Sequence, residues 1–330
     1  MVWTAESDMK DMTGKVCVVT GANAGLGKEI ATQLAKKGGT VIMACRNLNK
    51  AKEAEADISK DAPQAKVEVM QLDVASLESV ANFTAAFSAK YDRLDVLVNN
   101  AGIMAIYPRQ ETPDGFEMQL GINYLGAWAL TGRLLDMLIK TEGSRVVNQS
   151  SFAAFNATVF LDDLQMSNKD GRSKYGKFLG RWAAYGQSKL AQICHMTELS
   201  RRLAAAGHAH PKCFSAHPGY VYTNLQATAG NQAGALLAGT FFKIADSTIG
   251  QKVDMGALPV LYAISEESLQ GGELIGPDGL LSTAGYPAVV TVPSQALDDD
   301  TNAKLWEASE QLTKVTYDFG KRGDGSVSGA

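Results

Sequence analysis

Apolar residues along this chain fall into short runs that alternate with longer amphipathic segments. The runs are rich in Val, Ile and Leu, as strands buried on both faces must be, and they predict strands over 15–20, 40–45, 67–72, 96–99, 145–148 and 213–217. Apolar residues spaced three and four apart predict helices over 26–37, 48–58, 77–89, 116–138 and 185–204. Strand, helix and strand in this order imply right-handed crossovers. The pattern therefore predicts an α/β fold with a doubly wound parallel sheet and helices on both faces.

The alternation continues without a linker-like change in composition, which favours one domain over residues 1–321. Two segments interrupt it. The polar stretch 160–181 is interpreted as a surface insertion, and 224–250, rich in Ala, Gly, Leu and Phe, is interpreted as a mobile substrate lid. Residues 322–330 are expected to form a disordered tail.

Composition narrows the class of protein. The chain is 45% hydrophobic and 20% charged, as in ordinary globular proteins, and its net charge of −4 gives no basic face for nucleic acid. No secretory signal or apolar run of about 18 residues is present, so we expect a cytoplasmic protein without a membrane span. The four cysteines lack metal-ligand spacing, so we expect reduced core thiols and no metal.

A glycine-rich turn over 20–27 follows the first predicted strand directly, and a helix starts from its last glycine. Such a turn lets the backbone approach a pyrophosphate, which then meets the N–H groups and positive dipole of the helix N-terminus. The alternative is a turn with a purely structural role. The strand, turn and helix context favours a Rossmann-type dinucleotide site, with contacts expected from Gly21, Asn23, Ala24, Gly25, Leu26 and Gly27.

The end of the second predicted strand indicates which dinucleotide binds. NAD enzymes often carry Asp or Glu there, whereas this chain has Arg46 followed by Asn47. A guanidinium can bind a 2′-phosphate through paired hydrogen bonds, and a carboxylate would repel it. We therefore predict NADP(H) as the cofactor, with contacts from Arg46 and Asn47. The alternative is that Arg46 merely solvates a helix start.

Several motifs in one order resemble the short-chain dehydrogenase/reductase family across roughly residues 14–225. They are the glycine turn, Leu72-Asp73-Val74, Asn99-Asn100-Ala101-Gly102, Asn123, Ser150-Ser151, Tyr185-x-x-x-Lys189 and His217-Pro218-Gly219. The resemblance implies further cofactor contacts from Asp73, Val74, Asn99, Asn100, Ala101, Gly102, Pro218, Gly219, Val221 and Thr223. Asp73 could instead cap the next helix, and His217 is expected to shape a turn rather than act as a base.

The residue types also suit carbonyl or alcohol chemistry. Tyr185 and Lys189 stand four apart on a predicted helix and hence on one face. A phenol with an ordinary pKa of about 10 is a poor acid–base catalyst near neutrality, so an adjacent ammonium is expected to lower the pKa of Tyr185. Ser151 would hydrogen-bond the substrate oxygen. By the resemblance, Asn123 would line a water-mediated proton relay, and Lys189 would also hold the nicotinamide ribose.

Within the family, the chain is most similar to the retinol-dehydrogenase-like group, and near it to the light-dependent protochlorophyllide reductases. The latter generally carry a cysteine where this chain has Tyr220, which counts against photochemistry. A small apolar carbonyl or alcohol is the expected substrate. The pocket would draw on Tyr220, Tyr222, Met104, Phe152, Phe155, Leu236, Leu237, Phe241 and Phe242, although these residues could equally belong to the core.

Two alternatives to an ordinary NADP-dependent oxidoreductase are kept open. One is the photoreductase, and the other is a non-catalytic NADP-sensing protein. Such a sensor would have little reason to keep Asn123, Ser151, Tyr185 and Lys189 together. The long gap between Ser151 and Tyr185 could block the helix contact through which many family members dimerise. A monomer is therefore favoured over a dimer.

Overall fold

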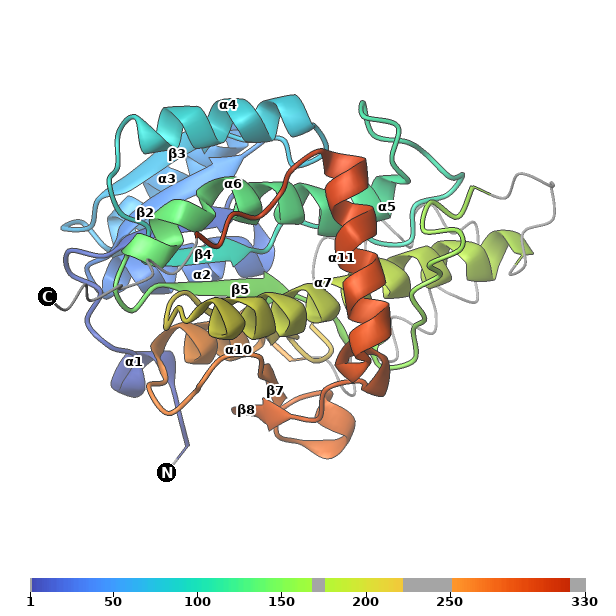
Figure 1. Cartoon of the computed structure of the whole chain (residues 1–330). Helices are drawn as coiled ribbons and strands as arrows, with labels where there is room; N and C mark the ends of the chain where they lie inside the picture. Colours follow the sequence, from blue (N-terminus) through green and yellow to red (C-terminus); the bar gives the residue numbers. More distant parts are fainter. Residues whose placement is uncertain (1, 168–175, 222–250, 321–330) are drawn as a thin grey trace, which may run out of the picture.

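The centre of the protein is one eight-stranded sheet in the order β3-β2-β1-β4-β5-β6-β7-β8 (Figure 1). This computed structural model describes residues 2–167, 176–221 and 251–320. The strands are β1 (Val16–Thr20), β2 (Thr40–Cys45), β3 (Val67–Gln71), β4 (Val96–Asn99), β5 (Arg145–Gln149), β6 (Lys212–Ala216), β7 (Leu274–Pro277) and β8 (Pro287–Val290). Neighbouring strands pair in parallel except β7 and β8, which are antiparallel. The predicted single-domain α/β fold is confirmed.

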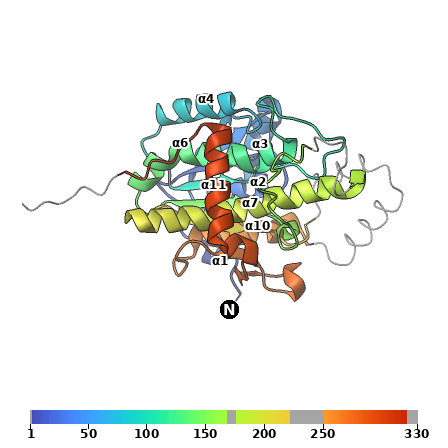
Figure 2. The same cartoon turned by 45° about the vertical axis from the view of Figure 1, so that its right-hand side comes forward.

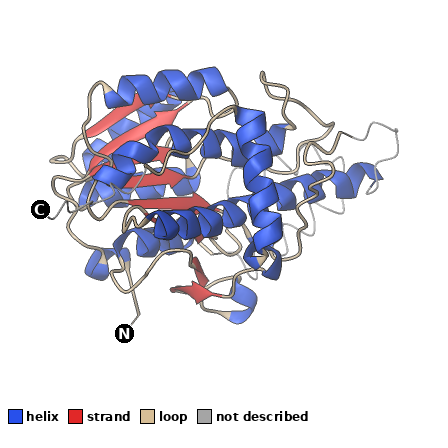
Figure 3. Ribbon diagram, viewed as in Figure 1, coloured by secondary structure: helices blue, strands red, loops and turns tan. Residues whose placement is uncertain are grey.

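Helices cover both faces of the sheet (Figure 3). One face packs against α2 (Gly25–Lys36), α3 (Leu48–Asp61) and α10 (Val253–Ser265), and the other against α4 (Leu77–Ser88), α6 (Gly126–Lys140) and α7 (Gly176–Ala206). Helix α11 (Asp299–Thr313) packs against α7. Figure 2 shows α11 crossing α6 and α7. The short helices are α1 (Ala5–Asp8), α5 (Met118–Leu120), a π turn (Gly121–Leu125) and the 3₁₀ turns Phe152–Ala154, Leu280–Ser282 and Ser294–Leu297.

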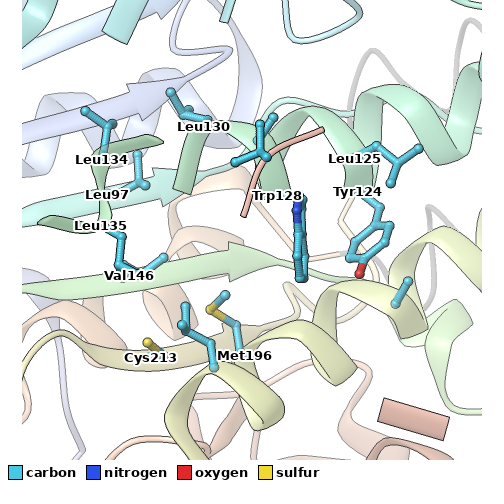
Figure 4. Packing of buried hydrophobic residues seen from close by; sticks show 14 of the residues in the cluster. Leu97, Tyr124, Leu125, Trp128, Leu130, Leu134, Leu135, Val146, Met196 and Cys213 are labelled. Atoms are coloured by element: carbon cyan, nitrogen blue, oxygen red, sulfur yellow. The ribbon is translucent and has the colours of Figure 1, made fainter. Parts of the chain in front are cut away.

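Two apolar clusters lie on opposite faces of the sheet because side chains alternate along each strand. In β4, Leu97 belongs to one cluster while Val96 and Val98 belong to the other. Figure 4 shows part of the first cluster, which includes Val146 of β5, Trp128 of α6 and Met196 of α7. Sheet and helices are thus held rigidly on both sides, which fixes the carboxyl ends of the strands in space.

The predicted helix over 116–138 runs from Met118 to Lys140 and contains a π segment. The chain forms α5, then a π turn, then α6, which extends to Lys140. Gly126, the first residue of α6, lies where an added Cβ would collide with the backbone oxygen of Val74. This segment therefore passes very close to the loop after β3. A π turn of this kind is frequent at functional sites.

The last third of the chain adds elements that the apolar pattern does not predict. Helix α10 lacks an amphipathic period because most of its residues are buried, and it contains Pro259. Strand β7 is short and ends in Gly276-Pro277, and β8 returns beside it as a hairpin without a crossover helix. The predicted parallel sheet is confirmed from β3 through β7, and β8 adds an antiparallel strand at its edge.

The segment interpreted as an insertion, 160–181, is partly anchored to the rest of the fold. The carboxamide of Gln187 accepts from the backbone nitrogen of Phe160 at 2.9 Å and donates to the backbone oxygen of Leu164 at 2.9 Å. Leu164 is buried, and α7 already starts at Gly176. Residues 168–175 of this segment, the predicted lid 224–250 and the tail 322–330 lie outside the described residues.

Candidate active site

A cavity of about 770 Å³ opens at the carboxyl ends of the strands. From β1 the chain passes to β2 and β3 on one side and later to β4 and β5 on the other. The strand order therefore reverses between β1 and β4, and in open α/β sheets ligands bind at such a point. The loops after β1, β2, β3, β4, β5 and β6 all contribute to the wall.

Most of the residues predicted from the sequence line this cavity. They are Gly21, Asn23, Ala24, Gly25, Leu26, Gly27, Arg46, Asn47, Asp73, Val74, Asn100, Ala101, Gly102, Ser151, Tyr185, Lys189, Pro218, Gly219 and Val221. Asn99 and Asn123 are buried behind the wall, and Thr223 lies outside the described residues.

The glycine turn is shaped for close approach. Gly21 has a positive φ of 66°, and a Cβ there would lie 3.1 Å from Cα of Ala101. A Cβ on Gly27 would lie 2.5 Å from the backbone oxygen of Gly21 and would also strike Asn100. Helix α2 begins at Gly25 and its N-cap Ala24 supplies no side-chain hydrogen bond, so the first N–H groups of α2 are left for a ligand.

We expect Gly27→Ala to destabilise the fold by about 1–3 kcal/mol, the usual cost of overpacking, and to weaken NADPH binding. Alanine is otherwise preferred over glycine in a helix by roughly 1 kcal/mol, so a net loss isolates the collision. Urea unfolding and fluorescence titration with NADPH measure the two effects. Unchanged stability and affinity would contradict the close packing of the turn.

The loop after β4 is fastened to β1 by Thr20. Its hydroxyl oxygen accepts from the backbone nitrogens of Asn100 at 3.0 Å and Ala101 at 2.9 Å, and the Asn100 carboxamide donates to the Thr20 backbone oxygen at 2.9 Å. Asn99 does not line the cavity. Its carboxamide donates to Thr131 and Asn148 and ties β4 to α6 and β5.

Two cationic side chains line the cavity beyond β2. Arg46 is exposed, and Lys50 stands one turn further along in α3. Asn47 caps α3 by accepting from the backbone nitrogen of Lys50 at 3.0 Å. The sequence did not lead us to predict Lys50 as a cofactor contact. Its spacing of four residues from Arg46, across the start of a helix, could have indicated that the two cations lie close together.

The candidate catalytic group lies on α7 and the loop after β5. Tyr185 is 8% exposed and Lys189 is 4% exposed, and the Lys189 Nζ lies 5.9 Å from the centre of the Tyr185 ring. Burial raises the pKa of Tyr185, opposed by a hydrogen bond with the Ser151 side chain, and burial lowers the pKa of Lys189 to about 7. The lowering of the Tyr185 pKa expected from Lys189 is therefore not seen in this structure, because burial has the larger effect on Tyr185.

Asn123 lies within the π turn and is fully buried. Its Oδ1 accepts from the backbone nitrogen of Ile103 at 2.8 Å, while its Nδ2 donates to the Ile103 backbone oxygen at 3.0 Å and to Ser188 Oγ at 2.9 Å. The carboxamide thus holds the loop after β4 against α7. It stands directly behind Gly102, with Lys189 on the same side of that glycine.

Lys189→Met is expected to change the pH dependence of stability. The folded pKa of about 7 lies below the ordinary 10.5, so between these pH values the unfolded chain binds the extra proton and wild-type stability rises with pH. The Met side chain binds no such proton, so the stability of Lys189→Met relative to wild type is highest near pH 7. This advantage shrinks by up to about 1.4 kcal/mol per pH unit towards pH 10.

Urea unfolding at pH 7 and pH 9.5 measures this change. The lost hydrogen bonds of Lys189 contribute a pH-independent offset, so the difference between the two pH values is the quantity to compare. Lys52→Met on the exposed side of α3 is the control and should show no such trend. A constant difference between Lys189→Met and wild type would show that Lys189 keeps its ordinary pKa.

The wall near Tyr185 is largely apolar. Of the residues predicted for a substrate pocket, Met104, Phe152 and Tyr220 line the cavity, whereas Phe155 packs behind it against Phe152 and His217. The cavity is also lined by four residues that the sequence pattern did not indicate: Ile103, Ile122, Ala153 and Trp182. Tyr222, Leu236, Leu237, Phe241 and Phe242 lie outside the described residues.

Asp73 and His217 both serve local turns. The Asp73 carboxylate lines the cavity and accepts from the backbone nitrogen of Ala75 at 3.0 Å, while the N-cap of α4 is Ser76. His217 is buried, and its Nδ1 accepts from the backbone nitrogen of Gly219 at 3.3 Å. Burial lowers the pKa of His217 to about 4. The expected role of His217 in shaping a turn is therefore consistent with its contacts.

Comparison with known proteins defines the class. A family model described as short chain dehydrogenase matches residues 15–161. Retinol dehydrogenase 13 of Mus musculus is 36% identical over 315 residues, which cover 94% of this chain and 87% of that protein. A crystal structure of an uncharacterized protein from Mycobacterium paratuberculosis aligns with a TM-score of 0.76 at 37% identity, covering 96% of this chain and all of that one.

The chain belongs to the short-chain dehydrogenase/reductase family, in its retinol-dehydrogenase-like branch. It is an NAD(P)-dependent oxidoreductase that acts on alcohol or carbonyl groups. A short chain dehydrogenase from Shigella flexneri complexed with NADP shares the fold, with a TM-score of 0.60 at 22% identity over 81% of this chain and 98% of that one. Across the described ranges, no helix is both long and apolar enough to cross a membrane.

Proposed function

We propose that this enzyme transfers a hydride between NADP(H) and the carbonyl or alcohol group of a small apolar molecule, with Tyr185 as the acid or base. The observation that carries the proposal is one cavity lined by the glycine turn, by Arg46 and by the Ser151, Tyr185 and Lys189 side chains. Phosphate-binding and proton-transfer groups therefore face the same space.

The cavity residues fit a dinucleotide with a 2′-phosphate. The N-terminus of α2, uncapped by Ala24, would hold the pyrophosphate, and Arg46 with Lys50 would hold the 2′-phosphate. Ala101 and Gly102 leave room for the adenosine. Asn47, Asp73 and Val74 would border its ribose and adenine, and Pro218, Gly219 and Val221 would lie near the nicotinamide.

When bound, the cofactor supplies or accepts the hydride. In carbonyl reduction the Tyr185 phenol donates a proton to the substrate oxygen, and Ser151 donates a hydrogen bond to that oxygen as negative charge develops. Burial favours the neutral phenol. The Lys189 ammonium then compensates the charge left on Tyr185. In alcohol oxidation the same groups act in reverse.

The substrate end of the cavity is proposed to accept an apolar molecule. Met104, Phe152 and Trp182 border the cavity, and Trp182 packs edge-to-face against Tyr185 with ring centres 6.3 Å apart. Apolar walls with a few convergent polar groups are typical of small-molecule sites. Ser151 and Tyr185 would be the polar groups that orient the reacting oxygen.

A panel of aliphatic, aromatic and isoprenoid aldehydes, ketones and alcohols tests the proposal. It is assayed with NADPH or NADP by absorbance in the dark. We expect turnover of the apolar members and little turnover of sugars, which are added to the panel as polar controls. Turnover that requires light would favour the photoreductase alternative. NADPH binding without any turnover would favour the sensor.

We also propose that the protein is a cytoplasmic monomer. All four cysteines are free and buried, as a reducing compartment allows. Sedimentation that finds a stable tetramer would contradict the monomer.

A further inference from the structure

The buried surroundings of Lys189 contain a polar partner that the family motifs do not assign. Gln192 stands one turn further along α7 and is fully buried. Its Oε1 accepts a hydrogen bond from the Lys189 Nζ at 3.0 Å. The same Nζ donates to the backbone oxygen of Gln149 at 2.7 Å. Two neutral acceptors therefore hold this cation.

These two contacts limit where the remaining donor can go. An ammonium carries three N–H donors, and Gln149 and Gln192 take two of them. Lys189 also lines the cavity. The third donor is left for a group inside the cavity, so the orientation of the ammonium depends on both acceptors.

Gln192 is itself fixed from the side away from Lys189. Its backbone oxygen accepts from the Asn148 carboxamide at 3.1 Å and from Ser215 Oγ at 3.4 Å. Asn148 is held in turn by Asn99 at 2.8 Å. These side chains come from β4, β5 and β6, so the sheet anchors the turn of α7 that carries Gln192.

The Gln192 side chain has little reason to be polar except for Lys189. Its Nε2 is buried and has no hydrogen-bond partner within the part of the chain that the structure describes. An unpaired buried amide nitrogen costs stability, and an apolar residue would avoid this cost. The contact of Oε1 with Lys189 is the interaction that offsets it.

We propose that Gln192 is a positioning residue that fixes the Lys189 ammonium through Oε1 and so aims its third donor into the cavity. This inference rests on the proposed role of Lys189 in holding the cofactor and assisting Tyr185. Gln192 itself does not line the cavity.

The hydrogen bond accepted by Gln192 Oε1 also affects the pKa of Lys189. Burial lowers the pKa of Lys189 to about 7, and a hydrogen bond accepted by Oε1 favours the charged form against that burial. Among the described neighbours, the titratable group that faces Lys189 is Tyr185, while Gly102, Gln149 and Gln192 are neutral. Loss of the Oε1 acceptor would therefore lower the pKa of Lys189 further.

Two substitutions at Gln192 test the proposal on the full-length enzyme. Gln192→Leu removes the acceptor at similar size, and Gln192→Glu keeps an acceptor and adds a negative charge. Gln295→Leu is the matched control, since Gln295 Oε1 accepts from the backbone nitrogen of Val159 at 3.0 Å away from the cavity. The measurements are NADPH affinity by fluorescence titration and kcat/KM for carbonyl reduction against pH.

For Gln192→Leu we expect NADPH to bind about ten-fold more weakly, the equivalent of one hydrogen bond to a charged group. Reduction should also lose activity at a lower pH than in wild type, because Lys189 gives up its proton earlier. Gln192→Glu should restore binding and move that loss of activity to a higher pH. Gln295→Leu should leave both readouts at wild-type values.

Wild-type affinity and an unshifted pH profile in Gln192→Leu would overturn the positioning role. If Gln192→Leu does not fold, the absence of an upward shift in Gln192→Glu would overturn it equally. Lys189→Met distinguishes a failure of the proposed function from a failure of the positioning role. Full activity and affinity in Lys189→Met would contradict the proposed function, whereas an inactive Lys189→Met beside an unaffected Gln192→Leu would contradict the positioning role alone.

Discussion

Tyr185→Phe is expected to lower kcat for hydride transfer by about 10³-fold, within the range that general acid–base catalysis contributes. The substitution removes the hydroxyl that shares a hydrogen bond with Ser151 and keeps the ring that packs against Trp182. NADPH affinity should stay nearly unchanged, because the glycine turn and Arg46 are untouched. Single-turnover absorbance at 340 nm and fluorescence titration separate chemistry from binding.

Tyr91→Phe provides the control for this experiment. The Tyr91 hydroxyl donates to Glu68 at 2.8 Å, outside the cavity, so its loss removes a phenol hydroxyl without touching the site. It should leave turnover unaffected. Substantial turnover in Tyr185→Phe would mean that another group transfers the proton, and the assignment of Tyr185 would fail.

Arg46→Ser is expected to reduce the preference for NADPH over NADH by about 10- to 100-fold, because hydrogen bonds to charged groups contribute about 1.5–3 kcal/mol each. The effect should fall on NADPH, while the Michaelis constant for NADH should change little. Lys50, which also lines the cavity, should retain part of the preference. Michaelis constants for both cofactors give the ratio directly.

Arg133→Ser on the exposed side of α6 removes the same charge away from the cavity and should leave the ratio unchanged. A wild-type enzyme that prefers NADH would contradict the NADP(H) assignment outright. An unchanged ratio in Arg46→Ser would move the recognition of the 2′-phosphate to Lys50.

The parts of the site that the sequence predicts well are those built from neighbouring residues. The glycine turn lies between β1 and α2, and Tyr185 and Lys189 share a face of α7 through their spacing. Arg46 follows β2 at the end where a ribose would lie. Each of these features depends on local geometry and on the parallel order of the strands. The apolar pattern already predicts that order.

Tertiary packing determined the features of the fold and of the site that depend on distant residues. The apolar pattern could not predict α10 or the β7–β8 hairpin, because α10 is mostly buried and β7 is very short. The directions of the pKa shifts of Tyr185 and Lys189 follow from burial among distant segments rather than from their spacing.

The contacts around Lys189 show the same division. The Tyr185-x-x-x-Lys189 motif could be found from the sequence alone, while the acceptors of the ammonium, Gln149 and Gln192, became visible only where β5 meets α7. By itself, the sequence determined the family and the nicotinamide class of cofactor, and it predicted the candidate catalytic residues. Only the folded chain decided how strongly those residues are desolvated and what holds them in place, because both depend on atoms brought together from remote parts of the sequence.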